Sequence, residues 1–211
     1  MMDCIGGIIW DWNGTLLNDI ELCVLTINEL LERRNLPLLS VNDYKEVFSF
    51  PVKNYYQKIG FDFKIEPFEI PALEFINRYN EQVQECNLHE DAYKVLSYFQ
   101  SVGISQFMLS AMKQDVLEDC LKSQQIGHFF EHVSGLDNHY ADSKMENGKR
   151  LISGLNLNVA ELVLIGDTVH DFEVATELGC QCILVANGHQ SREILQTTGV
   201  LVIDQLGKLL D

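Results

Sequence analysis

The chain has 211 residues, of which 46% are hydrophobic and 22% are charged, so it is long enough to bury a core and too apolar to be a disordered chain. Its formal net charge of −16 argues against a surface that binds nucleic acid or anionic membranes, because phosphate groups are bound by clusters of Lys and Arg. No apolar run approaches the length of a membrane span, which argues against a membrane-spanning protein.

The first predicted element is a strand at Cys4–Trp10, an apolar run that leads directly to Asp11. The turn residues Gly14 and Thr15 follow shortly after it. An apolar run that ends on a carboxylate and continues into Gly-Thr is typical of a buried strand that presents one acidic side chain at a tight turn.

The region from about residue 19 to residue 88 is predicted to be helical. Apolar residues recur at helical spacing from Ile20 to Leu31, and a second amphipathic pattern covers Phe68–Val83. We expect this region to be an insert after the first strand, with six aromatic side chains packed inside it: Phe48, Phe50, Tyr55, Tyr56, Phe61 and Phe63.

Beyond residue 88, short apolar runs alternate with amphipathic segments, which is typical of βα units on a parallel sheet. The predicted strands are Ser105–Leu109, His132–Ser134, Leu162–Ile165, Cys182–Val185 and Val200–Ile203. The predicted helices are Asp91–Ser101, Gln114–Lys122, Glu146–Leu155, Phe172–Leu178 and Ser191–Thr197.

Side chains that can do chemistry lie at four places in this pattern, each at the end of a strand or the start of a helix. They are Asp11, Ser110, Lys144, and the pair Asp167 and Asp171. Any one of them is common by chance, and a strand-terminal Asp or Ser alone is more often a turn or a helix cap. Open α/β sheets bind ligands at the carboxyl ends of their strands, so the four together indicate one binding site.

In this order, the four segments resemble the motifs of the haloacid dehalogenase-like phosphohydrolases. The resemblance implies an α/β fold with a doubly wound parallel sheet and a small inserted helical cap. The core would comprise residues 1–17 and 89–211, and the cap residues 18–88. The cap position and the segment Val185–His189 most resemble the branch that is similar to phosphoglycolate phosphatase.

The resemblance also implies a Mg²⁺ site. Asp11 would be both the nucleophile and a metal ligand, and the backbone carbonyl of Asn13 and the carboxylate of Asp167 would complete the protein ligands. Asp171 would support the metal through water or hold Lys144 in place. Carboxylate and carbonyl oxygens are the ligands that Mg²⁺ prefers.

The phosphate-binding residues are implied in the same way. Ser110 and the amide of Ala111 would bind the phosphate oxygens, Gly14 and Thr15 would complete the substrate-binding turn, and Lys144 would balance the charge. Lys149 competes for the last role, but it lies 18 residues before Asp167, whereas Lys144 lies 23 residues before it and opens its helix, which fits the family better.

Asn13 is the main departure from the family, whose phosphatases have an acid/base Asp at that position. An amide cannot transfer a proton, and loss of a general acid/base costs about 10²–10⁴-fold in rate. Three interpretations remain open. The protein is a slow phosphatase, or it binds phosphate esters without turnover, or it resembles the phosphonoacetaldehyde hydrolases, which use a cap lysine as a Schiff base. Lys53, in the segment Phe50–Tyr55 of the insert, is the candidate for that lysine.

The function that the resemblance implies is a Mg²⁺-dependent hydrolase of a small phosphorylated metabolite, acting through an aspartyl phosphate on Asp11. The apolar N-terminal run is too short for a signal peptide, and the six cysteines include no C-x-x-C pair. We therefore expect free thiols in a cytoplasmic protein, a monomer or homodimer without nucleic-acid or membrane partners.

Overall fold

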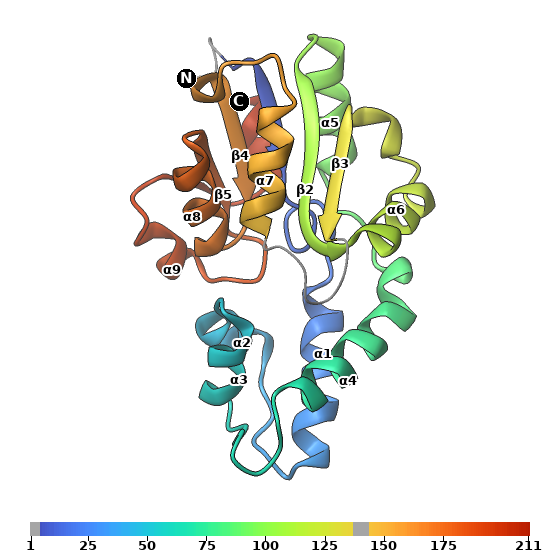
Figure 1. Ribbon diagram of the computed structural model, residues 1–211, viewed down its shortest axis with the longest axis vertical. Helices are drawn as coiled ribbons and strands as arrows, with labels where there is room; N and C mark the ends of the chain where they lie inside the picture. The colour runs from blue at the N-terminus through green and yellow to red at the C-terminus, as the bar shows by residue number, and fades with distance from the viewer. Residues whose placement is uncertain (1–4, 137–143) are drawn as a thin grey trace.

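A parallel six-stranded sheet forms the core of the protein (Figure 1). The computed structural model of the chain describes residues 5–136 and 144–211. The strands lie in the order β3-β2-β1-β4-β5-β6, and every neighbouring pair is parallel. Their bounds are β1 (Gly7–Trp10), β2 (Ser105–Lys113), β3 (His132–Leu136), β4 (Leu162–Gly166), β5 (Gln181–Val185) and β6 (Leu201–Ile203).

This arrangement confirms the predicted doubly wound parallel α/β fold. Each strand overlaps a predicted one, and the boundaries differ most at β1 and β2. Cys4 lies outside the described residues, and β1 begins at Gly7. β2 continues past the predicted end at Leu109, because the register with β3 shifts there and pairing resumes between Lys113 and Leu136.

Helices cover both faces of the sheet because alternate side chains of each strand point to opposite faces. Ile8 and Trp10 of β1 pack in one apolar cluster with Leu96 of α5, whereas Ile9 packs in a second cluster with Leu151 of α7 and Val174 of α8. The helices that follow the inserted region are α5 (Ala92–Ser101), α6 (Gln114–Ser123), α7 (Lys144–Ser153), α8 (Val169–Leu178) and α9 (Arg192–Gln196), with short 3₁₀ turns η2 (Gly127–Phe129), η3 (Val159–Glu161) and η4 (Leu206–Leu210).

Four helices lie between β1 and α5 in the sequence and form the lower part of the molecule in Figure 1, beyond the carboxyl ends of the strands. We call them the inserted helices: α1 (Ile20–Arg33), α2 (Val41–Val47), α3 (Val52–Lys58) and α4 (Glu69–Gln82), which the short turn η1 (Val83–Glu85) follows. α1 and α4 pack side by side. The division into a core and a cap at residues 18–88 stays a prediction.

Five cysteines are free thiols, as expected, and they are Cys23, Cys86, Cys120, Cys180 and Cys182. Among the helices of the described residues, none is both long and apolar enough to cross a bilayer.

Candidate functional site

Two aspartates meet where the order of the strands reverses. Asp11 follows β1 directly and Asp167 follows β4 directly, and these two strands are neighbours in the sheet. The backbone of Asp11 continues the pairing, because its N–H donates to Ile165 O over 2.9 Å. In doubly wound sheets the point of reversal is where ligands bind, so the fold itself brings these two predicted residues together.

Asp11, Asp167 and Asp171 form a buried acidic cluster, in which one oxygen of each lies within 4.8 Å of the others. Thr15 Oγ1 lies 3.1 Å from Asp11 Oδ2 and 3.0 Å from Asp167 Oδ1, so its single proton is shared between two carboxylates. Burial raises the pKa of Asp11 and of Asp167 above the usual aspartate range, and repulsion from the other carboxylates raises both further.

Lys144 is the cation of this cluster. Its side chain is 4% exposed and its Nζ forms ion pairs with Asp11 and with Asp171 Oδ1, the latter over 2.5 Å. Burial alone would lower the pKa of Lys144, but these two carboxylates raise it above its ordinary value. Lys149 lies five residues further along α7, where it is exposed and pairs with Glu146 and Glu177. The fold therefore brings Lys144, and not Lys149, to Asp11.

Asp171 lies in the first turn of α8 and fixes the loop before it. Its Oδ2 accepts hydrogen bonds from the N–H and the hydroxyl of Thr168, at 3.0 and 2.6 Å, and Thr168 caps the helix in return. The N–H of Asp167 also donates to this oxygen over 3.2 Å. Because the other oxygen receives Lys144, the contacts favour the positioning of Lys144 over a direct bond to a metal.

The acidic cluster could hold a divalent cation. Three buried carboxylates face one lysine, so negative charge is in excess, and the donors are oxygens of the kind that hard cations bind. Burying such charge without compensation is costly. The side chains present therefore fit a divalent metal.

Two glycines make room for Asp167. Gly14 has φ +72°, a left-handed conformation, and a Cβ there would collide with the Asp167 carboxylate and with the ring of His189. A Cβ on Gly188 would collide with the same carboxylate. The backbone thus approaches Asp167 from two loops that are far apart in the sequence.

The predicted phosphate-binding pair splits into two environments. Ala111 is exposed and lines the cavity described below, whereas Ser110 is fully buried and does not line it. Ser110 Oγ accepts a hydrogen bond from Met112 N over 3.0 Å. The hydrogen bond of Ser110 therefore supports the last part of β2, and Ala111 is the member of the pair that lines the cavity.

Asn13 is held by two neighbours on the inserted helices' side. Its Nδ2 donates to Asp19 Oδ2 over 3.0 Å and to Tyr79 OH over 2.7 Å. Tyr79 OH in turn donates to Asp19 Oδ2 over 2.6 Å. A carboxylate at position 13 would face Asp19 at this distance, so the amide fits where an acid would be repelled.

A cavity of about 530 Å³ lies between the strand ends and the inserted helices. Asp11, Lys144 and Asp167 lie at one side of it, and aromatic side chains cover much of the other. Those aromatic residues are Tyr44, Phe48, Phe50, Tyr55, Tyr56, Phe68, Phe75 and Tyr79. Four of the six aromatic residues that the sequence predicts to pack inside the insert thus also line a cavity. The two that do not line it are Phe61 and Phe63.

Lys53 lies away from this cavity. Its side chain is exposed, and its Nζ lies 5.6 Å from the ring centre of Phe63 and 5.8 Å from that of Phe68. It is not among the cavity's lining residues. The structure does not bring Lys53 to the other predicted site residues.

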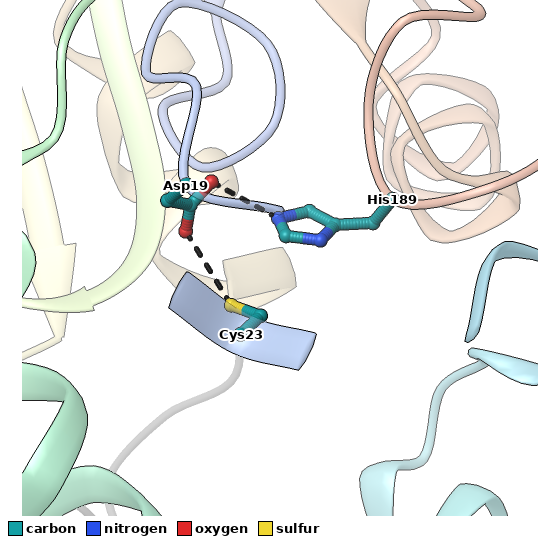
Figure 2. A group of neighbouring side chains, drawn as sticks. All are labelled: Asp19, Cys23 and His189. Atoms are coloured by element: carbon teal, nitrogen blue, oxygen red, sulfur yellow. Dashed lines mark hydrogen bonds and ion pairs between the residues drawn. The ribbon is translucent and has the colours of Figure 1, made fainter. Parts of the chain in front are cut away.

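Asp19, Cys23 and His189, which the sequence pattern did not single out, meet in the fold (Figure 2). Asn13 contacts this group through Asp19. Asp19 is buried and 3.2 Å from His189 Nε2. Burial would raise the pKa of Asp19, but His189 lowers it to about 2. Burial would lower the pKa of His189, but Asp19 raises it to about 9. The i, i+4 spacing of Asp19, the residue before α1, and Cys23 in the first turn of α1 was the one local signal of this group.

The sequence is similar to known proteins of one family. The family model described as haloacid dehalogenase-like hydrolase matches residues 8–185, which is most of the chain. A phosphoglycolate phosphatase of Caulobacter vibrioides is 25% identical over 201 residues, which cover 91% of this chain and 83% of that protein.

Solved structures share the fold over almost the whole chain. A haloacid dehalogenase-like family protein from Streptococcus pneumoniae superposes with a TM-score of 0.81 at 17% identity, covering 98% of this chain and 97% of its own. A predicted phosphoglycolate phosphatase from Haemophilus somnus superposes with a TM-score of 0.78 at 18% identity, covering 100% and 98%. At these identities the likeness concerns the fold.

Proposed function

The chain belongs to the haloacid dehalogenase-like hydrolases, and on that premise we propose that it is a Mg²⁺-dependent phosphatase of a small phosphorylated metabolite. The observation that carries the proposal is the carboxylate of Asp11, which stands at the end of β1, faces the cavity and is in contact with Lys144. The similarity to a phosphoglycolate phosphatase supports phosphate-ester chemistry.

Asp11 acts as the nucleophile. One carboxylate oxygen attacks phosphorus, the bond from phosphorus to the leaving oxygen breaks, and a phosphoaspartate forms. Water then attacks the same phosphorus, which releases inorganic phosphate and regenerates the carboxylate. When bound by Asp11, Asp167 and the carbonyl of Asn13, Mg²⁺ supplies positive charge that offsets the repulsion between carboxylate and phosphate.

Lys144 supplies the fixed positive charge of the protein itself. Held between Asp11 and Asp171, its ammonium group stands beside the attacking oxygen throughout the reaction. Such a preorganised charge stabilises the negative charge that develops in the transition state. The amide of Ala111, a residue that lines the cavity, would donate to a phosphate oxygen, as the family resemblance implies.

Asn13 affects the leaving group. Its amide donates to Asp19 and Tyr79 and has no proton to give to an alkoxide. We therefore expect a steep dependence of rate on the acidity of the leaving alcohol, with phenols released faster than alkyl alcohols. The apolar, largely aromatic lining of the cavity also favours an ester whose organic part is aromatic or apolar.

The test is phosphate release across a panel of phosphomonoesters after removal of bound metals, with and without added Mg²⁺. The panel should include aryl phosphates of graded leaving-group acidity, alkyl phosphates and 2-phosphoglycolate. We expect Mg²⁺-dependent turnover of the aryl esters, and its loss in Asp11→Asn and Asp11→Ala. Turnover that survives both substitutions would contradict the nucleophile.

The same panel distinguishes the binding interpretation. If no ester is hydrolysed while phosphate or a phosphate ester binds in a Mg²⁺-dependent way by calorimetry, the protein binds phosphate esters and is not a phosphatase. Loss of that binding in Asp167→Asn with retention of the fold by circular dichroism would locate the ligand at the acidic cluster.

A further inference from the structure

We propose that Asp19, Cys23 and His189 form a second metal site, which takes a borderline transition metal of the Zn²⁺ class. Figure 2 shows the three side chains turned toward one another, Asp19 and Cys23 at the start of α1 and His189 in the loop after β5. His189 Nε2 lies 3.2 Å from Asp19 Oδ1, and Cys23 Sγ lies 3.7 Å from Asp19 Oδ2. This group is distinct from the acidic cluster and does not depend on the proposed reaction.

The donor types separate the two sites. The acidic cluster offers only oxygens, whereas the second group offers one thiol sulfur, one imidazole nitrogen and one carboxylate oxygen. Zn²⁺ binds such mixed sets, at about 2.3 Å from sulfur and about 2.0–2.2 Å from nitrogen and oxygen. Mg²⁺ prefers oxygen ligands, so the second group selects the softer metal.

The three donors are close enough for one ion. One ligand atom of each residue lies within 4.8 Å of the other two, and all three side chains are buried. Two ligands at about 2.0–2.3 Å from a tetrahedral metal lie roughly 3.3–3.8 Å apart. The separations of these atoms are therefore close to those that one tetrahedral metal ion requires.

Neighbouring hydroxyl groups orient the ligands. Tyr44 OH lies 3.0 Å from His189 Nδ1, so Nδ1 can carry the ring proton while Nε2 faces the metal. Tyr79 OH and the N–H of Gly14 donate to the two oxygens of Asp19 over 2.6 and 2.8 Å. Metal-bound histidines and carboxylates are held in this way by outer partners.

Three protein ligands leave one tetrahedral position for water or for a ligand from the cavity. All three residues line the cavity that Asp11 also lines, so this position opens toward the same space. The ion would also connect α1 with the loop after β5. On binding, the thiol and any Nε2 proton are released to solvent, and no other group is oxidised or reduced.

The experiment titrates the metal-free protein with Zn²⁺ against a chromophoric chelator, and with Co²⁺ as a spectroscopic substitute. We expect one equivalent of Zn²⁺ to bind, and Co²⁺ to show a near-ultraviolet thiolate charge-transfer band with the strong visible bands of a tetrahedral site. Cys23→Ser should remove the charge-transfer band. His189→Gln should weaken binding by at least the roughly 10–100-fold that loss of an outer partner costs.

Two matched variants identify the source of the signal. Cys180→Ser removes a half-buried thiol outside the cluster and should leave the band unchanged. Asp11→Asn alters the acidic cluster and should also leave the band unchanged, which separates this site from the Mg²⁺ site. Circular dichroism in chelator shows whether each variant is folded.

The proposal is overturned if wild type binds no more Zn²⁺ than Cys23→Ser, or if wild type with Co²⁺ shows no thiolate band. It is also overturned if the band persists in Cys23→Ser. The absence of the thiolate band in wild type decides the matter even where a variant fails to fold, and would leave the group as an ion pair with a thiol hydrogen bond.

Discussion

The strand ends and the inserted helices contribute different kinds of residue to the two sides of the cavity. At the strand ends, Asp11, Lys144 and Asp171 form contacts whose partners are charged and fixed by strand register or helix caps. On the inserted helices, most of the lining is aromatic, and rings such as Phe48 and Tyr55 pack edge to face at 5.3 Å. In the function proposed above, the strand ends would make and break bonds and the inserted helices would select the leaving group.

The strongest test of the charged side is Lys144→Met. This change leaves three buried carboxylates without their cation, so we expect the metal-free protein to lose about 3–5 kcal/mol of unfolding free energy. Turnover should fall as well. The measurement is urea unfolding in chelator, followed by phosphate release with Mg²⁺.

Lys149→Met is the matched control on the same helix. Lys149 is exposed, and we expect no measurable change in stability or rate. If Lys149→Met loses as much stability and turnover as Lys144→Met, the ion pairs of Lys144 are not the cause of the loss.

The ion pair of His189 and Asp19 joins the two sides, and its strength should depend on pH. The pKa of His189 rises from an ordinary 6.5 to about 9 on folding. The pair therefore stabilises the fold fully below about pH 6.5, and the gain of about 3 kcal/mol disappears as pH rises through about 9. We would measure the free energy of unfolding of wild type and of His189→Gln by urea from pH 6 to 9.5, in chelator, and expect the difference between the two proteins to shrink as pH rises. If that difference is constant with pH, the ion pair does not contribute to stability as described.

Asn13→Asp tests whether the missing acid can be restored by one substitution. Because Asn13 Nδ2 is 3.0 Å from Asp19 Oδ2, the new carboxylate would be repelled by Asp19, and we expect a loss of about 1–3 kcal/mol with no gain in rate. The double variant Asn13→Asp/Asp19→Asn should recover the stability in a double-mutant cycle. If Asn13→Asp alone turns over substrate faster than wild type, then Asp19 does not hinder an acid at position 13.

The smallest effect is expected on the aromatic side. Phe50 is 38% exposed, lines the cavity and lies 4.7 Å from the ring of His170. Phe50→Ala should raise KM for an aryl phosphate about 10-fold and leave kcat nearly unchanged, because the lost contact acts on binding alone. Ile65→Ala, at a residue that is 84% exposed, is the control. A fall in kcat as large as the rise in KM would give Phe50 a part in the chemistry.

Local pattern was enough for the strands and for the charged side of the site. A buried parallel strand such as β4 is a continuous apolar run, and the residue after it is at the ligand-binding edge by topology, so Asp167 could be predicted from order alone. Lys144 was separable from Lys149 because only the former opens its helix.

Long-range pairs could not be predicted in this way. Asp19 precedes α1 and looks like an ordinary helix cap, and its ion pair with His189 closes across 170 residues. The aromatic residues of the insert were assigned to packing because sequence gives the period of a helix but not the space left between helices. Lys53 had a suggestive position in the sequence, yet α3 turns it toward Phe63 and Phe68.

The close approach of two loops to Asp167 limits which residues the chain can carry at positions 14 and 188. Gly14 and Gly103 share the same left-handed backbone, with φ +72° and +76°, but a Cβ on Gly103 would meet no atom within 4 Å. Saturation mutagenesis should therefore accept asparagine at position 103, accept alanine there only at the cost of backbone strain, and reject both at positions 14 and 188. A carboxylate at the end of β4 dictates which residues are permitted at two sites that lie 174 residues apart in the sequence.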